Sequence, residues 1–203
     1  MTLVIAAVVG LIVLVAILAV VFGSSAKKKT QVWMDAASAN GLAGKGLYPL
    51  LGLTGSVDGV AVSLDQQREL VEDARGQPEV DADGAQEHHT VCEASAVPLH
   101  GIGDLEVAEA GLFAKLGKLV GVAGIKTGDD AFDRRFTVKA SDREAAIRVL
   151  APAARAALTD VEKRIRHVSV HAGAVRYHGH RVDFAHALEI VRGLAKVASS
   201  LGA

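Results

Sequence analysis

Apolar residues fill the first part of the chain without interruption. From Leu3 to Phe22 every residue is Leu, Ile, Val, Ala, Phe or Gly, and no charged residue occurs between Thr2 and Gly23. About 20 helical residues at 1.5 Å each span a hydrocarbon core of roughly 30 Å. The pattern therefore predicts a single transmembrane helix, with residues 1–25 as an anchor in the lipid bilayer.

A cleaved signal peptide is the competing interpretation of this segment. Ser24 and Ala26 are small residues at a suitable spacing for cleavage, which would release a secreted domain. However, no basic residue precedes the apolar run, and the run is longer than the roughly 7–15 residues of a signal-peptide core. The sequence therefore favours the anchor.

Positive charge follows the predicted helix directly. Lys27, Lys28 and Lys29 stand after it, whereas the short N-terminal tail carries only its amino group. Because basic flanking residues stay on the cytoplasmic side, we expect a single-pass protein with its C-terminal domain in the cytoplasm.

Small residues recur every fourth position in the predicted anchor. Ala6 with Gly10, and Ala19 with Gly23, could let a second copy or another helix approach closely, although simple lipid packing is the alternative. Trp33 follows near the bilayer edge, where its indole could lie among the headgroups or pack on the domain.

The pattern after the anchor first predicts a short helix and two strands. Residues 31–40 contain good helix formers and end at Asn40-Gly41, residue types that favour a helix end. The apolar runs Leu50–Leu53 and Val57–Leu64, separated by Thr54–Ser56, predict a strand pair. The polar, acidic stretch 65–89 is broken by Gly and Pro, which predicts a surface loop.

Short strands are predicted in the middle of the chain. The alternating segments Thr90–Val97 and Asp104–Ala108 favour strands, as does Phe136–Lys139. Leu112–Val120 fits a helix or a strand equally well, so its structure stays open.

Helix signals return in the last third. Ser141 and Glu144 match a capping box that begins a helix, and Pro152 ends or kinks this helix before a second one over residues 153–164. The segments His167–Val170 and Ala174–Tyr177 flank Ala172-Gly173, which predicts a tight hairpin.

The final helix is predicted from residue 183 onward. Asp183 is suited to cap it, and apolar residues at helical spacing form one face. We expect Leu188 and Val191 on that face to pack against the sheet.

These elements predict an α+β fold, because helices do not alternate regularly with strands. We expect one N-terminal transmembrane helix followed by a mostly antiparallel sheet with helices packed on one face. The expected division is an anchor over residues 1–25, a juxtamembrane helix and linker over 26–45, and a soluble α+β domain over 46–203.

Charge and cysteine content exclude several functions. The 203 residues contain 22 Lys and Arg against 23 Asp and Glu, a formal charge of −1. The net charge therefore provides no general attraction for nucleic acid, which we do not expect as a partner. The single cysteine, Cys92, allows no internal disulfide and no usual structural zinc site. Cys92 alternates with Val91 in a predicted strand, which indicates a packed thiol.

Eight histidines are the first candidates for chemistry, since imidazoles bind zinc, nickel or copper. In the predicted hairpin, His167, His171 and His178 share a face with Arg176, and His167 lies opposite His178. Because Arg176 opposes a cation and no carboxylate completes the set, a solvated polar face is the favoured interpretation. We expect no bound metal.

The cluster Asp129–Asp133 is the second candidate, because aspartates at this spacing can bind calcium or act as acid and base. The full twelve-residue calcium-loop pattern is absent. We expect a structural corner with Phe132 and Phe136 facing inward and the charges paired locally.

Motifs of common enzymes are absent from the sequence. It has no GxSxG, no GxxxxGK[ST] and no HExxH. The glycines of residues 121–126 (GVAGIK) lack the strand-helix-strand context of a dinucleotide site. We therefore expect no catalytic residue and no cofactor.

One stretch of the chain, TGDDAFDRRFTVKASD at residues 127–142, resembles a motif of uncharacterised bacterial proteins that join an N-terminal membrane helix to a soluble domain. The resemblance covers most of residues 31–203. Its most specific residues are Gly128, Asp129, Phe132, Asp133 and Phe136, and the earlier positions Trp33, Ala37, Gly41, Leu42 and 55–62 match in order and spacing. It implies a location in the bacterial inner (cytoplasmic) membrane and no particular reaction.

Two functions remain as hypotheses. The first is a membrane-tethered cytoplasmic interaction or scaffold module that binds another protein or a second copy. The second is an enzyme or metal-binding sensor that uses the histidine-rich hairpin or the Asp129–Asp133 cluster.

Overall fold

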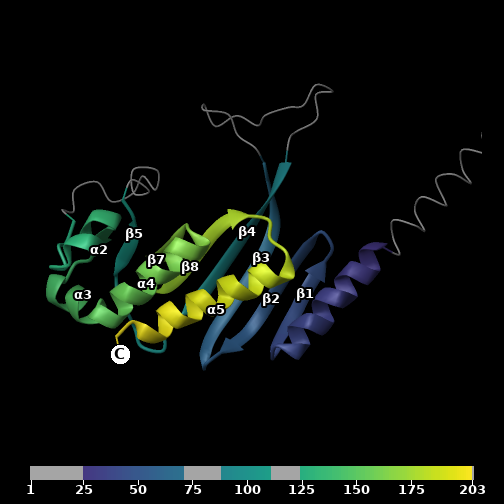
Figure 1. Ribbon diagram of the computed structural model, residues 1–203, viewed down its shortest axis with the longest axis horizontal. Helices are drawn as coiled ribbons and strands as arrows, with labels where there is room; N and C mark the ends of the chain where they lie inside the picture. Colours follow the sequence, from purple (N-terminus) through teal and green to yellow (C-terminus); the bar gives the residue numbers. More distant parts are fainter. Residues whose placement is uncertain (1–24, 71–87, 111–123, 203) are drawn as a thin grey trace, which may run out of the picture.

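The computed structural model describes residues 25–70, 88–110 and 124–202 and has an α+β architecture (Figure 1). At its centre is one eight-stranded sheet with the strand order β1-β2-β3-β4-β8-β7-β5-β6, in which every neighbouring pair is antiparallel. The predicted α+β class with an antiparallel sheet is confirmed. The predicted anchor lies outside the described residues, among which no helix is long and apolar enough to cross a bilayer.

The first four strands form a meander. They are β1 (Leu42–Leu47), β2 (Leu50–Val57), β3 (Val60–Leu70) and β4 (His88–Val97). The turn between β2 and β3 lies at Asp58-Gly59, whose φ angles of 50° and 81° suit a two-residue hairpin loop. The prediction of a break at Thr54–Ser56 is wrong, because those residues belong to β2 and pair with β3.

Two segments that were expected outside the sheet belong to it. β1 occupies most of the predicted linker, and its sequence LAGKGL escapes recognition because two glycines and a lysine dilute the strand signal. The predicted loop over 65–89 is also wrong at both ends, since β3 continues to Leu70 and β4 begins at His88. Residues 71–87 and the undecided segment Leu112–Val120 lie outside the described residues.

The strands of the second half of the sheet come from parts of the sequence before, between and after helical segments. It contains β5 (Glu106–Glu109), β6 (Phe136–Lys139), β7 (Val168–His171) and β8 (Ala174–His180). The predicted hairpin at Ala172-Gly173 is confirmed, with Val170 opposite Val175. β8 also pairs with β4, which joins the two halves.

Five helices or helical segments are described: residues 25–39, α2 (Asp130–Arg135), α3 (Arg143–Val149), α4 (Pro152–Ile165) and α5 (Phe184–Ser200). Pro152 opens α4 as predicted. The cap of α3 is Asp142, whose carboxylate accepts hydrogen bonds from Glu144 N–H and Ala145 N–H. The predicted cap, Ser141, is wrong because its N–H donates to Asp104 instead, at 2.6 Å.

The last helix is confirmed with one correction. Asp183 caps α5 and Val191 is buried, as predicted. Leu188 is only half-buried and lines a shallow hollow beside Arg164, so the expectation that it faces the sheet is wrong. Ile190 and Leu194 are fully buried in its place, because the helix is turned toward the sheet by these positions.

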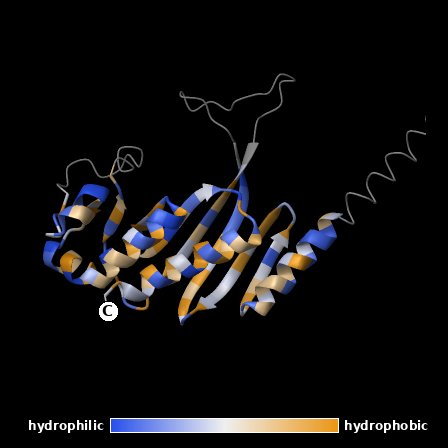
Figure 2. Cartoon of the chain, in the orientation of Figure 1, coloured by the Kyte–Doolittle hydropathy of each residue, from blue (hydrophilic) through white to orange (hydrophobic). Residues whose placement is uncertain are grey.

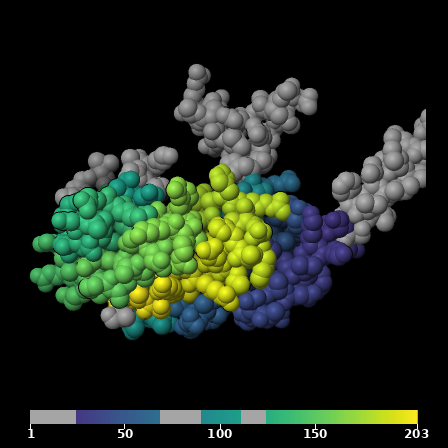
Figure 3. Space-filling model, viewed as in Figure 1, coloured from purple at the N-terminus to yellow at the C-terminus, as the bar shows by residue number. Residues whose placement is uncertain are grey.

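The helices form a layer on one face of the sheet. α5 crosses β2, β3, β4 and β8, and α4 packs beside α5 and over β7 (Figures 1 and 3). Along the strands, hydrophobic residues are interspersed with polar ones (Figure 2), and the hydrophobic residues contribute to the core beneath the helices. Trp33 is buried, donates from Nε1 to the Gly52 carbonyl oxygen at 2.8 Å, and meets the Phe184 ring edge-on. Its indole therefore packs on the domain, the second of the two predicted alternatives.

Candidate functional site

The face of the sheet opposite the helices is the main candidate site. Along β3, Val60, Val62 and Leu64 are buried beneath the helices, while the alternate residues Ala61 and Asp65 are exposed. The same alternation continues through β4 and β8. No described helix covers this second face, which we call the open face.

A line of hydroxyl groups crosses the open face. In the strand register Thr54 lies opposite Ser63, Ser63 opposite Ser95, and Ser95 opposite Arg176. Ser169 lies opposite Arg176 on its other side. This hydroxyl row therefore places four hydroxyls and one guanidinium across five adjacent strands.

A line of charged groups runs beside it. Asp65 lies opposite Glu93, and Glu93 opposite His178. Lys45 Nζ is 2.8 Å from Asp65 Oδ2, and His178 Nδ1 is 3.3 Å from Glu93 Oε1. This charged row is thus largely paired within itself.

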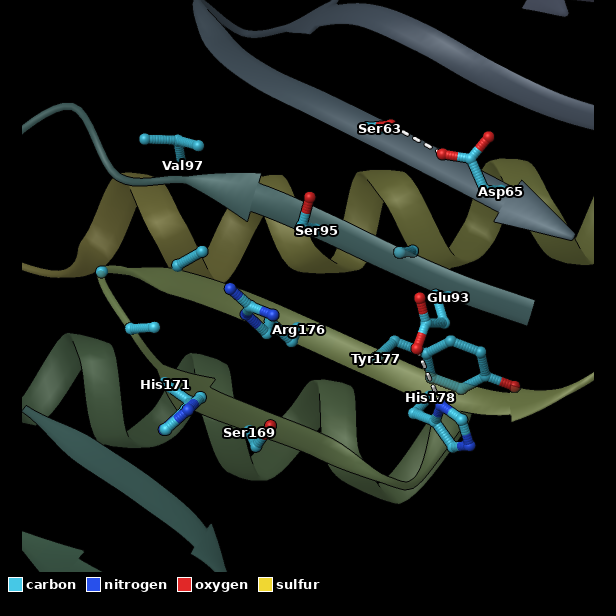
Figure 4. Close-up of a pocket in the computed structure, with 14 residues that line it drawn as sticks. Ser63, Asp65, Glu93, Ser95, Val97, Ser169, His171, Arg176, Tyr177 and His178 are labelled. Atoms are coloured by element: carbon cyan, nitrogen blue, oxygen red, sulfur yellow. Dashed lines mark hydrogen bonds and ion pairs between the residues drawn. The ribbon is translucent and has the colours of Figure 1, made fainter. Parts of the chain in front are cut away.

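The two rows border a hollow of about 700 Å³ (Figure 4). Arg176 projects into it between Ser95 and Ser169, with Glu93 and His178 at one end and Val97 at the other. Among the residues that the structure describes, Arg176 forms no ion pair or side-chain hydrogen bond. Arg176 is therefore an exposed guanidinium in a row of hydroxyls, left unpaired by the described residues.

The chemistry of the hollow suits an anionic, hydrogen-bonding group. A guanidinium offers five N–H donors in a planar fork that matches a carboxylate or a phosphate, and each serine hydroxyl can donate or accept. The exposed pairs of the charged row are screened by salt and contribute orientation more than stability.

The three histidines proposed as metal ligands are not brought together. His171 Nδ1 lies 3.0 Å from Glu106 Oε1, and His178 pairs with Glu93. His167 precedes β7 with a φ of 51° and lines a different hollow, near His186. The predicted pairing of His167 with His178 is therefore wrong, because the chain leaves α4 through two positive-φ residues before the strand begins.

Potential metal ligands are scattered throughout the described ranges. There, no three His, Cys, Asp or Glu side chains are close enough to hold a common ion. Three of the surface histidines, His171, His178 and His186, instead each lie beside a single carboxylate.

The Asp129–Asp133 cluster forms a corner of the fold. Asp129 caps α2 by accepting from Ala131 N–H and Phe132 N–H. Asp133 accepts from the Thr127 N–H at 3.0 Å and from the Thr127 hydroxyl at 2.9 Å. Phe132 and Phe136 stack with ring centroids 4.7 Å apart and are both buried, so the predicted inward-facing pair is confirmed.

The acidity of Asp133 reflects this corner. Partial burial opposes its charge, but the hydrogen bonds from Thr127 and Gly128 outweigh burial and lower the pKa of the carboxyl below its usual value. The carboxylate therefore stabilises the loop geometry.

Cys92 is buried on the covered face, as predicted from its place in a strand. Burial, with help from the nearby Asp65 and Glu93 carboxylates, raises the pKa of its thiol to about 12. The thiol is therefore protonated and unreactive at neutral pH. In the glycine-containing stretch 121–126, residues 121–123 lie outside the described residues.

The hydroxyl row was missed by sequence reasoning. Isolated serines in strands carry no motif, and only the pairing of β4 with β8 aligns Ser95 with Arg176.

Comparison of the chain with models of protein families, with curated proteins and with solved structures finds no match.

Proposed function

We propose that this chain is a membrane-tethered cytoplasmic interaction module whose open face binds a partner protein. The observation that carries the proposal is Arg176, which stands without an ion pair among the described residues, in a hydroxyl row that borders a hollow of about 700 Å³. A guanidinium so placed is ready to accept an acidic group from a partner.

The tether is supported by the sequence on either side of residue 25. The uncharged run Leu3–Phe22 has the length of a membrane span, and Lys27–Lys29 favour a cytoplasmic domain. The helix over residues 25–39 is docked on the sheet through Trp33. The resemblance to membrane-anchored bacterial proteins agrees with this arrangement.

Recognition would use the two rows differently. The Arg176 fork would take a carboxylate of the partner, while Ser95 and Ser169 supply hydrogen bonds beside it. The charged row, with Asp65 and Glu93 among its members, would repel a partner whose acidic groups are misplaced, so it contributes specificity.

Site-specific photo-crosslinking of the full chain in its native membrane tests the binding surface. A photoreactive residue at Ser95, on the open face, should give one discrete adduct with a protein, and Arg176→Glu should abolish it. The same photoreactive residue at Lys163, exposed on α4, is the matched control and should give no such adduct. Equal adducts at both positions would refute a specific surface.

Topology reporters test the tether separately. A C-terminal reporter that works only in the cytoplasm should be active, and one that works only outside it should be silent. The reverse result would refute the cytoplasmic location and leave the binding surface to be judged by the crosslinks.

A further inference from the structure

A second hollow lies where the helix over residues 25–39 begins. It has a volume of about 390 Å³ and combines three cations with an apolar lining. We call it the basic pocket; its cations are Lys28, Lys29 and Arg181, and its lining includes Val32, Trp33 and Phe184. It is distinct from the open face, because Leu51 and Gln66, which also line it, belong to the covered face.

Two of the cations are held in place by one aromatic ring. Lys29 Nζ lies 4.5 Å from the centroid of Tyr48, and the Arg181 guanidinium carbon lies 4.9 Å from it. Lys29 also donates to the Tyr48 hydroxyl at 3.3 Å. Hydrogen bonds from Arg181 and Lys29 lower the pKa of the Tyr48 hydroxyl, which agrees with concentrated positive charge at this point.

These cations are not neutralised within the described part of the chain. No carboxylate there forms an ion pair with Lys28, Lys29 or Arg181; Asp183, which also lines the pocket, caps α5 by accepting from the His186 N–H. The basic pocket therefore suits a ligand that combines an anionic group with a hydrocarbon part, because three cations lie beside an aromatic ring and an apolar lining.

The chain itself places the basic pocket near a membrane. Ser25, on the rim of the pocket, stands three positions after Phe22, the end of the predicted span. At no more than about 3.6 Å per residue, the rim lies within roughly 11 Å of the end of the hydrocarbon core. The headgroup region of one leaflet is about 5–7 Å deep, so the rim lies within this region or next to its outer edge. Val32 is 61% exposed here, as expected for a side chain that meets lipid.

We propose that the basic pocket binds the headgroup of an anionic phospholipid. The lipid phosphate lies against Lys28, Lys29 and Arg181, and the glycerol and upper acyl carbons lie against Val32, Trp33 and Phe184. The inference rests on the membrane tether of the proposed function but not on partner binding at the open face.

Trp33 is the single tryptophan of the chain and lines the basic pocket, so its fluorescence reports on this site alone. The full chain is placed in phosphatidylcholine nanodiscs that contain a minor fraction of brominated phosphatidylglycerol or of brominated phosphatidylcholine. Bromine quenches only at short range. The brominated anionic lipid should quench Trp33 more strongly than the same fraction of the neutral one.

Arg181→Gln is the decisive variant, because Arg181 lies far from the lysines that set topology. It should lower the preference for the anionic lipid about fivefold, the effect of one basic residue at an anionic surface. Lys28→Gln with Lys29→Gln should lower it further. Arg148→Gln, an exposed arginine on α3, is the matched control and should change nothing. Circular dichroism checks that each variant is folded.

Each contrary result has a separate meaning. Equal quenching by the two lipids, or a preference that survives Arg181→Gln, overturns the headgroup site. Loss of the preference in excess inorganic phosphate would show a site for free phosphate and also overturn the lipid assignment. A chain that does not enter the nanodiscs refutes the tether and this site together, whereas missing crosslinks at Ser95 would refute only the open-face proposal.

Discussion

The two faces of the sheet are made by the same strands but have opposite properties. On β3, Leu64 is fully buried while its neighbour Asp65 points to solvent; on β4, Cys92 is fully buried while Glu93 is exposed. The covered face is continuous with the core, and the open face is a surface of hydroxyls and charges. One alternating pattern thus produces a stabilising face and a polar face that is open to solvent.

The difference indicates on which face substitutions can change function with little effect on stability. Substitutions on the covered face remove packing, because its side chains interlock with α5. Substitutions on the open face remove groups that water already solvates, so they cost little free energy of unfolding. Each prediction below compares the two faces or tests an exception to the rule.

Thiol reactivity should separate the faces most strongly. Cys92 should react with a maleimide or disulfide reagent at pH 8 about a thousandfold more slowly than an ordinary thiol, because its pKa is raised to about 12 and it is buried. Ser95→Cys, made in a Cys92→Ala background, should react at an ordinary rate. Stopped reactions followed by mass spectrometry measure both rates, and rapid labelling of native Cys92 would contradict the burial.

Leu64→Ala should be the most destabilising of the next set. Its side chain is fully buried, so truncation should cost about 2–5 kcal/mol in lost transfer energy and cavity formation. Ser63→Ala, one residue away on the open face, should cost less than about 1 kcal/mol. Urea denaturation of the full chain in mild detergent gives both values, and equal losses would mean that the open face is packed.

Gly179→Ala should cost about 1–3 kcal/mol by overpacking. A Cβ at this position would overlap the Tyr177 hydroxyl, which lies directly over Gly179 on the covered face. His178→Ala, the adjacent residue on the open face, removes an exposed ion pair and should cost under about 1 kcal/mol. A Gly179→Ala protein as stable as the unaltered chain would show that the tyrosine moves freely.

Asp133 is a polar residue whose hydrogen bonds stabilise the fold, and its substitution should have the smallest effect on stability. Its folded pKa is lowered, so its contribution is complete above the unfolded value of about 3.9 and is lost as pH falls through the folded value. Asp133→Asn should therefore cost about 1 kcal/mol at pH 7, and the difference should shrink as the pH falls from about 4 through the lowered pKa of the folded state. Asp130→Asn, exposed on the same helix, should cost less than about 0.5 kcal/mol at pH 7. A constant difference for Asp133→Asn across this pH range would contradict the hydrogen-bonded carboxylate.

Local signals in the sequence were sufficient for much of the fold. Pro152 at the start of α4, Asp183 at the start of α5 and the Ala172-Gly173 turn act within a few residues, and the structure has all three. The errors arose where a partner distant in sequence decides the outcome. Ser141 fails as a cap because Asp104 takes its N–H, and β1 forms a strand because β2 pairs with it.

The candidate site was less accessible from sequence for the same reason. Alternation placed Arg176 and His178 on one face of the hairpin correctly, but the hollow also requires Ser95 and Glu93 from β4, which pairs with β8 across more than 80 residues. No short motif encodes that pairing. The basic pocket likewise joins Lys28 to Arg181, which only the tertiary fold brings together.

The position of α5 after the strands that it covers has a consequence for synthesis. The strands β1 to β4 can pair as soon as they are made, because their contacts are local. The apolar face of β2 to β4, however, is covered by α5 (Phe184–Ser200), which is synthesised long after them. Until α5 has been made, the nascent meander exposes Leu53 and Leu64 to its surroundings, so the newly made chain depends on this helix to avoid aggregation.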